Sequence, residues 1–143
     1  MFLGTHEHAL DDKGRVIMPS RFRPQLEGGV VMVPWFEDCV AIFPREEFQR
    51  VMEKLETFPE GMEEKRFLER VLMGLAYEAV PDRQGRLTIP PRLRQIAGLE
   101  REVAIVGLKN RVEIWDRARW EETLAVGWGK SGEMASKIAQ LGF

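Results

Sequence analysis

The chain has 143 residues, of which 44% are hydrophobic and 31% are charged, and its formal net charge is −2. This composition is ordinary for a soluble globular protein, and the length is that of one domain. The single cysteine, Cys39, excludes an internal disulfide. No apolar run approaches the roughly 20 residues of a membrane helix, and the N-terminus lacks a secretory signal pattern. We therefore expect a cytoplasmic protein.

One stretch of this sequence occurs twice, 71 residues apart. DDKGRVIMPSRFR begins at Asp11 and DRQGRLTIPPRLR begins at Asp82, and six of the thirteen positions are identical. The similarity continues through two later apolar segments of each copy. The chain is therefore predicted to contain two copies of one unit. The predicted parts are unit 1 (5–47), a helical connector (48–75), unit 2 (76–119) and a helical tail (120–143). Because a unit of about forty residues buries little surface alone, the two units should share one core.

Each unit should begin with a strand, a tight turn and a returning strand. The predicted strands are 5–10 and 15–18 in unit 1, and 76–80 and 86–89 in unit 2. In each turn, Asp can hydrogen-bond the backbone and Gly can supply the positive φ that such turns require. Strand alternation places one side of each returning strand in the core. The residues predicted to be buried are Val16, Met18, Leu87 and Ile89. Arg15 and Arg86 should therefore point outward.

The later segments of the chain predict further strands and amphipathic helices. A short helix should follow each turn, closed in unit 2 by Gly98 and shortened in unit 1 by Pro24. Apolar strands are predicted at 30–34, 39–43, 103–107 and 111–115. Helices are predicted at 44–58, 63–75 and 116–126, with a break at 127–132 before a last amphipathic piece. In the third of these helices, Trp120 and Leu124 should point inward.

No catalytic or metal-binding constellation emerges from the sequence. His6 and His8 share one side of a strand but have no third ligand nearby, so a metal site is disfavoured. Cys39 is expected to be a buried, inert thiol. The four tryptophans are expected to be core residues or subunit contacts. We predict no enzyme activity, no cofactor, no metal and no small-molecule substrate.

The repeated Asp-x-x-x-Arg has two interpretations. In the structural one, Asp caps the turn and Arg pairs with a nearby carboxylate. In the functional one, two symmetry-related arginines at loop tips contact duplex DNA, where Arg can bind guanine O6 and N7 through two hydrogen bonds. Two further arginines on the segment behind each turn, four in all, are equally compatible with structural ion pairs and with DNA contacts. These are Arg21, Arg23, Arg92 and Arg94.

The charge distribution favours a nucleic-acid partner despite the negative total. Residues 11–26 carry a net charge of +2 and residues 82–98 carry +3, so the remainder of the chain carries −7. The repeated stretches are thus basic within an acidic protein, and local charge decides which ligands a surface attracts.

The sequence resembles the MraZ family, bacterial transcriptional regulators built from two AbrB-like (SpoVT-AbrB) units. The resemblance rests on MFLG at the N-terminus, the two Asp-x-x-x-Arg runs, and GLKNRVEIWDRARWEETL from Gly107. It implies an α+β, β-rich fold in which the units form a double-split β-barrel with pseudo-two-fold symmetry and flanking amphipathic helices. It also implies a ring of about eight to twelve chains. That ring would bind short G-rich direct repeats and repress its own operon of division and cell-wall genes, which makes it nucleoid-associated.

The resemblance implies DNA-contacting roles for Arg15 and Arg86, with Asp11 and Asp82 as their motif partners. Lys13 is a further phosphate-contact candidate, but its counterpart is Gln84, so the two turns should not contribute equally. The alternative function is an AbrB-type antitoxin-like protein-interaction module. A long disordered partner-binding tail would mark such a module, whereas the extra segments of this chain are predicted to be folded.

Overall fold

The computed structural model describes all residues, 1–143, and contains eight strands and six helices. The strands are β1 (Phe2–Ala9), β2 (Arg15–Ile17), β3 (Val30–Trp35), β4 (Cys39–Pro44), β5 (Tyr77–Ala79), β6 (Arg86–Thr88), β7 (Glu102–Lys109) and β8 (Arg111–Asp116). The helices are α1 (Arg23–Leu26), α2 (Arg45–Glu56), α3 (Glu63–Leu72), α4 (Pro91–Ile96), α5 (Arg117–Gly129) and α6 (Ser131–Gln140). The predicted strand-rich α+β class is confirmed.

The strands form two antiparallel sheets that interleave the two units. The larger has the order β1-β7-β8-β4-β3-β5, and the smaller pairs β2 with β6. Thus β1 of unit 1 pairs with β7 of unit 2, and β2 pairs with its counterpart β6. The predicted strand–turn–strand elements are present, but our expectation that the two strands flanking each turn return on one another was wrong. Each strand that flanks a turn instead pairs with a strand of the other unit, so neither unit folds around a core of its own.

One continuous core joins the smaller sheet to the inner face of the larger one. All four returning-strand residues predicted to be buried, namely Val16, Met18, Leu87 and Ile89, are at most 1% exposed. They pack with alternate residues of β3, β4, β7 and β8, and with Leu26 of α1 and Leu93 of α4. The two-residue period of the strands thus turns one face of the larger sheet toward the smaller sheet. The small sheet is held in place by the same core that holds the large one.

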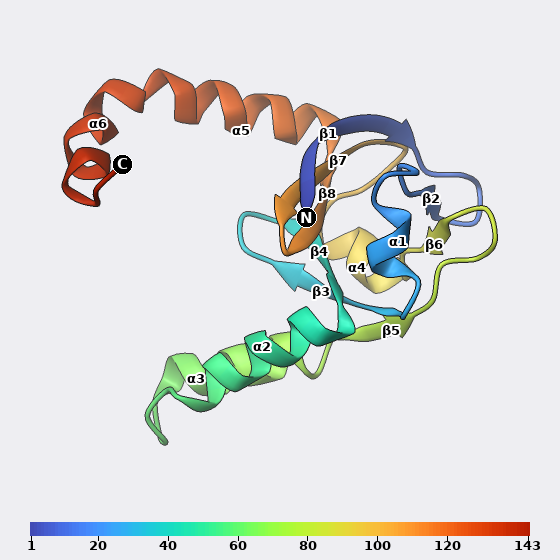
Figure 1. Cartoon of the computed structure of the whole chain (residues 1–143), viewed down its shortest axis with the longest axis horizontal. Coiled ribbons are helices and arrows are strands. Elements are labelled where there is room, and N and C mark those ends of the chain that lie inside the picture. The colour runs from blue at the N-terminus through green and yellow to red at the C-terminus, as the bar shows by residue number, and fades with distance from the viewer.

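The outer face of the larger sheet meets two helical projections, which Figure 1 shows extending from the same side of the molecule. The first, the leg, is formed by α2 and α3, and its Leu72 packs against Val31, Val33 and Phe43. The second, the arm, is formed by α5 and α6. Near the start of α5, Trp120 packs against Trp115 with ring centroids 5.4 Å apart. Beyond that contact the arm extends away from the sheet (Figure 1).

The predicted helices match the structure except in the tail. As expected, α1 is shorter than α4, because Pro24 lies within it. However, α5 continues through Gly127 to Gly129, and α6 begins after Lys130. The expectation that Leu124 points inward was wrong, since 46% of it is exposed. No helix combines the length and the apolar character that crossing a membrane would demand.

Candidate nucleic-acid interface

The turn of unit 1 is organised by the carboxylate of Asp11. Its Oδ1 accepts hydrogen bonds from the backbone N–H of Lys13 and of Arg15, each at 2.9 Å. Its Oδ2 accepts the Nε–H of Arg15 at 2.6 Å. Gly14 closes the turn with a φ of +74°, a conformation that favours glycine. One carboxylate therefore fixes both the backbone of the turn and the direction of the arginine that follows it.

The turn of unit 2 repeats this geometry. Asp82 Oδ1 accepts the backbone N–H of Gln84 and of Arg86 at 2.9 Å, and Oδ2 accepts Arg86 Nε–H at 2.7 Å. Gly85 has a φ of +77°. The backbone N–H of Arg86 is the main influence that lowers the pKa of Asp82, and the Arg86 guanidinium acts in the same direction. The corresponding donors lower the pKa of Asp11. Both carboxylates are therefore ionised at neutral pH.

The β2–β6 ladder brings the two arginines to one exposed surface. In its register Arg15 faces Thr88 and Arg86 faces Ile17, while Val16 and Leu87 pair on the core side. Because Arg15 and Arg86 are diagonal neighbours on the outward face, their α-carbons are separated by about 7–8 Å. Their side chains are 27% and 28% exposed. The sequence predicted the direction of these side chains, and the ladder places them next to one another.

The structural interpretation of Asp-x-x-x-Arg, in which Asp caps the turn and pairs with Arg, is therefore correct. Each arginine is paired with its own aspartate through Nε. This pairing leaves the Nη1/Nη2 edge of each guanidinium without a hydrogen-bond partner within the chain, and a guanidinium has five N–H donors in a fixed plane. The aspartate thus holds the arginine in one orientation while its donor edge stays available. The structural interpretation and the DNA-contact interpretation are compatible.

Two further arginines connect the units, a role that the sequence analysis missed. Arg23 Nε donates to the carbonyl oxygen of Met18 at 3.0 Å, and Arg94 Nε donates to that of Ile89 at 2.9 Å. Each guanidinium then lies over the turn glycine of the other unit, Arg94 over Gly14 and Arg23 over Gly85. These arginines make no ion pair. Their identity in both copies was the available signal, but their partners lie in the opposite unit.

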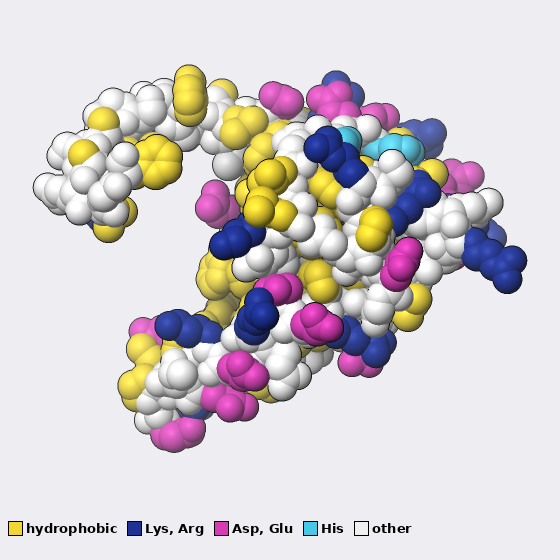
Figure 2. All heavy atoms as spheres, viewed as in Figure 1, with side chains coloured by type: hydrophobic (Ala, Val, Ile, Leu, Met, Phe, Trp, Pro, Cys, Tyr) yellow, Lys and Arg dark blue, Asp and Glu magenta, His cyan; other side chains and the backbone are white.

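The remaining basic residues of the repeat are exposed. Lys13 and its counterpart Gln84 occupy the tips of the two turns, and Arg21 and Arg92 lie on the segments behind them. Figure 1 shows both turns, beside β2 and β6, at the side of the molecule opposite to the arm and the leg. Figure 2 shows Lys and Arg side chains on that side. This surface, formed by the β2–β6 ladder and its two turns, is called the turn face below. Its guanidinium edges can bind phosphate oxygens or the acceptor edge of a guanine.

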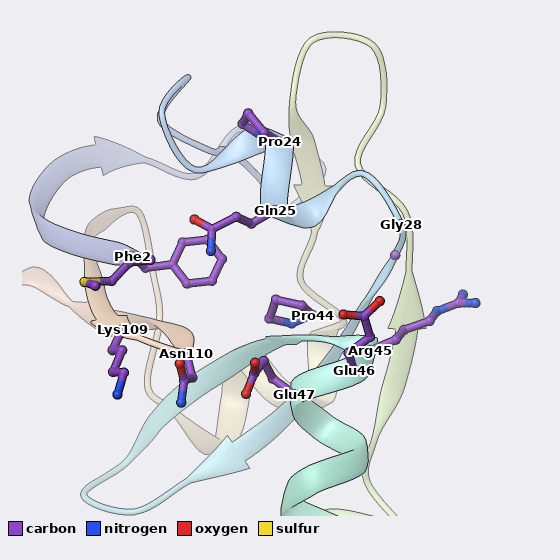
Figure 3. Close-up of a pocket in the computed structure, with 12 residues that line it drawn as sticks. Phe2, Pro24, Gln25, Gly28, Pro44, Arg45, Glu46, Glu47, Lys109 and Asn110 are labelled. Atoms are coloured by element: carbon purple, nitrogen blue, oxygen red, sulfur yellow. The ribbon is translucent and has the colours of Figure 1, made fainter.

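Other parts of the structure offer no comparable site. A hollow of about 540 Å³ lies between β1, α1 and the start of α2 (Figure 3), and its charged lining residues are Arg45, Glu46, Glu47 and Lys109. It contains no nucleophile–base pair. Burial raises the pKa of the Cys39 thiol, so this thiol is not activated. No group of three or more His, Cys, Asp or Glu side chains is placed to hold a metal ion.

Comparison with known proteins identifies two adjacent matches to one family model. The model described as "MraZ protein, putative antitoxin-like" matches residues 1–71 and again 72–126. A transcriptional regulator MraZ from Salinispora arenicola is 49% identical over 125 residues, which cover 87% of this chain and 88% of the relative. One from Parafrankia sp. is 47% identical over 138 residues, 96% of each chain. One from Kineococcus radiotolerans is 51% identical over 124 residues, 87% of each.

Proposed function

Because the chain belongs to the MraZ family, we propose that it is a sequence-specific DNA-binding repressor of its own operon of division and cell-wall genes. The relatives compared above are named transcriptional regulators, and the family is one of regulators and not of enzymes. We propose that the protein acts in the cytoplasm, associated with the nucleoid. Its two units would together form the double-split barrel of AbrB-like proteins.

The observation that carries this proposal is the paired arrangement of Arg15 and Arg86 on an exposed two-stranded ribbon. A major groove about 12 Å wide admits such a ribbon. The two arginines point outward from diagonal positions of the ladder, and each is oriented by its own aspartate. A donor that is already oriented loses less entropy on binding. In this mechanism Arg15 and Arg86 bind guanine edges, whereas Lys13 contacts a phosphate.

A single ribbon contacts few base pairs, so sequence recognition would come from several copies acting together. We propose a ring of about eight to twelve chains that binds short G-rich direct repeats. In a ring, the binding of one subunit raises the effective concentration of the next repeat at its neighbour. Direct repeats suit this arrangement, because successive subunits of a ring present their turn faces in the same sense.

The test is titration of a labelled fragment of the chain's own promoter region with the purified protein at two salt concentrations. Removing each base-contacting arginine should cost about 1–3 kcal/mol. The double variant Arg15→Ala/Arg86→Ala should therefore bind far more weakly and lose its preference over a scrambled fragment. Arg70→Ala, which removes an exposed arginine of α3, is the matched control and should bind as wild type does. Unchanged affinity in the double variant would exclude this mechanism.

A second candidate function is an antitoxin-like protein-interaction module, which the description of the matching family favours. A module of this kind would hold a small partner protein at equal stoichiometry. Affinity purification of the full chain followed by mass spectrometry tests the idea. Recovery of one small protein at a one-to-one ratio, together with promoter binding that ignores sequence, would make this function the better one.

A further inference from the structure

The two turns are held from the opposite unit as well as by their own aspartates. In the turn of unit 1, the carbonyl oxygen of Gly14 accepts the backbone N–H of Ile89 at 2.9 Å. In the turn of unit 2, the carbonyl oxygen of Gly85 accepts the backbone N–H of Met18 at 2.8 Å. Ile89 and Met18 are fully buried in the common core, so each turn is anchored to a fixed point. Each turn is therefore incomplete without the other unit.

This anchoring reaches the DNA-contacting arginines through one peptide group. The carbonyl of Gly14 and the N–H of Arg15 belong to the same planar peptide unit. Ile89 binds the carbonyl from the other unit, and Asp11 accepts the N–H at 2.9 Å. The peptide group before Arg86 is held in the same way. Hydrogen bonds on both sides fix the plane of the peptide, and that plane sets the direction in which the arginine side chain leaves the turn.

A guanidinium of the opposite unit covers each of these peptide groups. Arg94 Nε donates to the carbonyl oxygen of Ile89 at 2.9 Å, and its Cζ lies 2.6 Å from the point where a Cβ on Gly14 would stand. The guanidinium therefore fills space that only a glycine leaves free. Arg23 lies over Gly85 in the same way. Ile89 thus holds Gly14 through its N–H and, through its carbonyl, holds the arginine that covers Gly14.

The contact depends on the shape of arginine and not on its charge alone. Arg23 and Arg94 form no ion pair, and both are half-buried at the turns that they cover. Arg21 and Arg92, on the same segments, are exposed and cover no glycine. A guanidinium is planar and carries a donor at Nε, where the lysine side chain has a carbon. Lysine therefore cannot replace arginine in this contact.

We propose that Arg23 and Arg94 are positioning residues for DNA recognition, and that each acts on the DNA-contacting arginine of the opposite unit. Arg94 holds the turn of Arg15, and Arg23 holds the turn of Arg86. The proposal rests on the DNA-binding function proposed above. A binding group must be kept close to its productive geometry by neighbours whose own positions are fixed. The crossed contacts do this for both arginines, because neither turn can move without breaking a contact with the other unit.

The first experiment measures amide hydrogen exchange in the full chain without DNA. Arg94→Lys keeps the charge but removes the Nε donor. It should make the turn at 11–15 exchange about tenfold faster, the loss expected for one hydrogen bond from a charged group, and leave the turn at 82–86 unchanged. Arg23→Lys should give the reverse. Arg92→Lys is the matched control and should change neither turn. Faster exchange in the arginine's own unit, in both turns equally or in neither turn would overturn the proposal.

The second experiment repeats these substitutions in promoter titrations. Arg94→Lys should weaken binding about tenfold in wild type and in the Arg86→Ala background. In the Arg15→Ala background it should weaken binding by less than about twofold, because the residue that it positions is absent. Arg23→Lys should show the opposite dependence. The salt dependence should stay as in wild type, since lysine keeps the positive charge. Equal effects of Arg94→Lys in both backgrounds would overturn the proposal.

A direct contact of Arg94 with a DNA phosphate gives a different result. Lysine also binds phosphate as a point charge, so Arg94→Lys would then bind nearly as wild type does, and its effect would not depend on Arg15. That result would overturn the proposal. The two experiments also separate this proposal from the proposed function. Crossed hydrogen exchange supports the positioning of the turns even where Arg15→Ala/Arg86→Ala keeps its affinity, a result that refutes only the proposed DNA contacts.

Discussion

Helices α2 and α5 start at the same point of the two units but have different surroundings. Each follows directly after the last strand of its unit, at Arg45 and Arg117. Helix α2 has a strongly amphipathic sequence, and with α3 it covers one side of the sheet. Helix α5 has no distinct polar face, and it contacts the sheet near its start through Trp120 and through the ion pairs of Arg117 with Glu7 and Glu102. The two helices therefore begin at equivalent points of the repeat, but their different sequences lead them to pack differently against the sheet.

The two turns, unlike the two helices, have kept the same geometry. In both units one Asp accepts the same two backbone N–H groups and the same arginine Nε–H, with distances that agree within 0.1 Å. The difference has a physical reason in the proposals above. In the proposed DNA-binding mechanism the two turns hold their arginines in the same way, whereas nothing in that mechanism requires α2 and α5 to be alike.

The largest expected effect is a difference between α2 and α5 in how much a leucine-to-alanine substitution lowers the free energy of unfolding. Leu55 of α2 is 4% exposed, and Leu55→Ala should lower the free energy of unfolding by about 2–5 kcal/mol because it leaves a cavity. Leu124→Ala in α5 should change it by no more than about 0.5 kcal/mol. Both losses are measured by urea unfolding of the full chain. A loss from Leu124→Ala as large as that from Leu55→Ala would contradict the exposed position of Leu124.

The turns could be predicted from the sequence because their geometry is local. Asp, Gly and Arg stand within five residues, and turn chemistry fixes their arrangement. The pairing of β2 with β6 could not be predicted from the sequence. Strand alternation indicates which face of a strand is buried, but it does not indicate which other strand pairs with it. Arg23 and Arg94 were misjudged for the same reason, since each covers a glycine in the other unit. Leu124 was predicted to point inward from its spacing to Trp120, but a helical period does not tell how far along α5 the sheet extends, and Leu124 lies beyond the contact that Trp120 makes.

The second expected effect tests whether the two turns are equivalent. Gly14→Ala and Gly85→Ala should each lower the free energy of unfolding by about 1–2 kcal/mol from the positive φ alone. A methyl group at Gly14 would also stand 2.6 Å from Cζ of Arg94, and one at Gly85 would meet Arg23. Urea unfolding of both variants measures the losses.

Gly28→Ala is the matched control for this pair. Its φ is not positive, a Cβ there meets no atom within 4 Å, and so the substitution should not destabilise the protein. Similar losses at Gly14 and Gly85 would establish that the two turns are held equally. A loss confined to one of them would show that the symmetry of the hydrogen bonds does not extend to their energetics.

The smallest expected effect concerns Lys13 and Gln84, one of the two positions at which the turn tips differ, the other being Asp12 and Arg83. Lys13→Gln gives the first tip the residue that the second tip has at this position, and it should reduce the salt dependence of promoter binding by about one phosphate contact for each bound chain. Gln84→Lys should increase it by a similar amount, because the backbone of both tips is held by the same aspartate contact. Neither change should alter the preference for the promoter over a scrambled fragment, because a phosphate contact does not distinguish bases. Titrations at several salt concentrations measure the slope, with Lys109→Gln, an exposed site outside the turn face, as the control. Gln84→Lys could instead leave the slope unchanged while Lys13→Gln reduces it. The two turns would then not meet the DNA backbone in the same way. In that case the paired-ribbon mechanism would be replaced by one in which unit 1 alone makes the phosphate contacts.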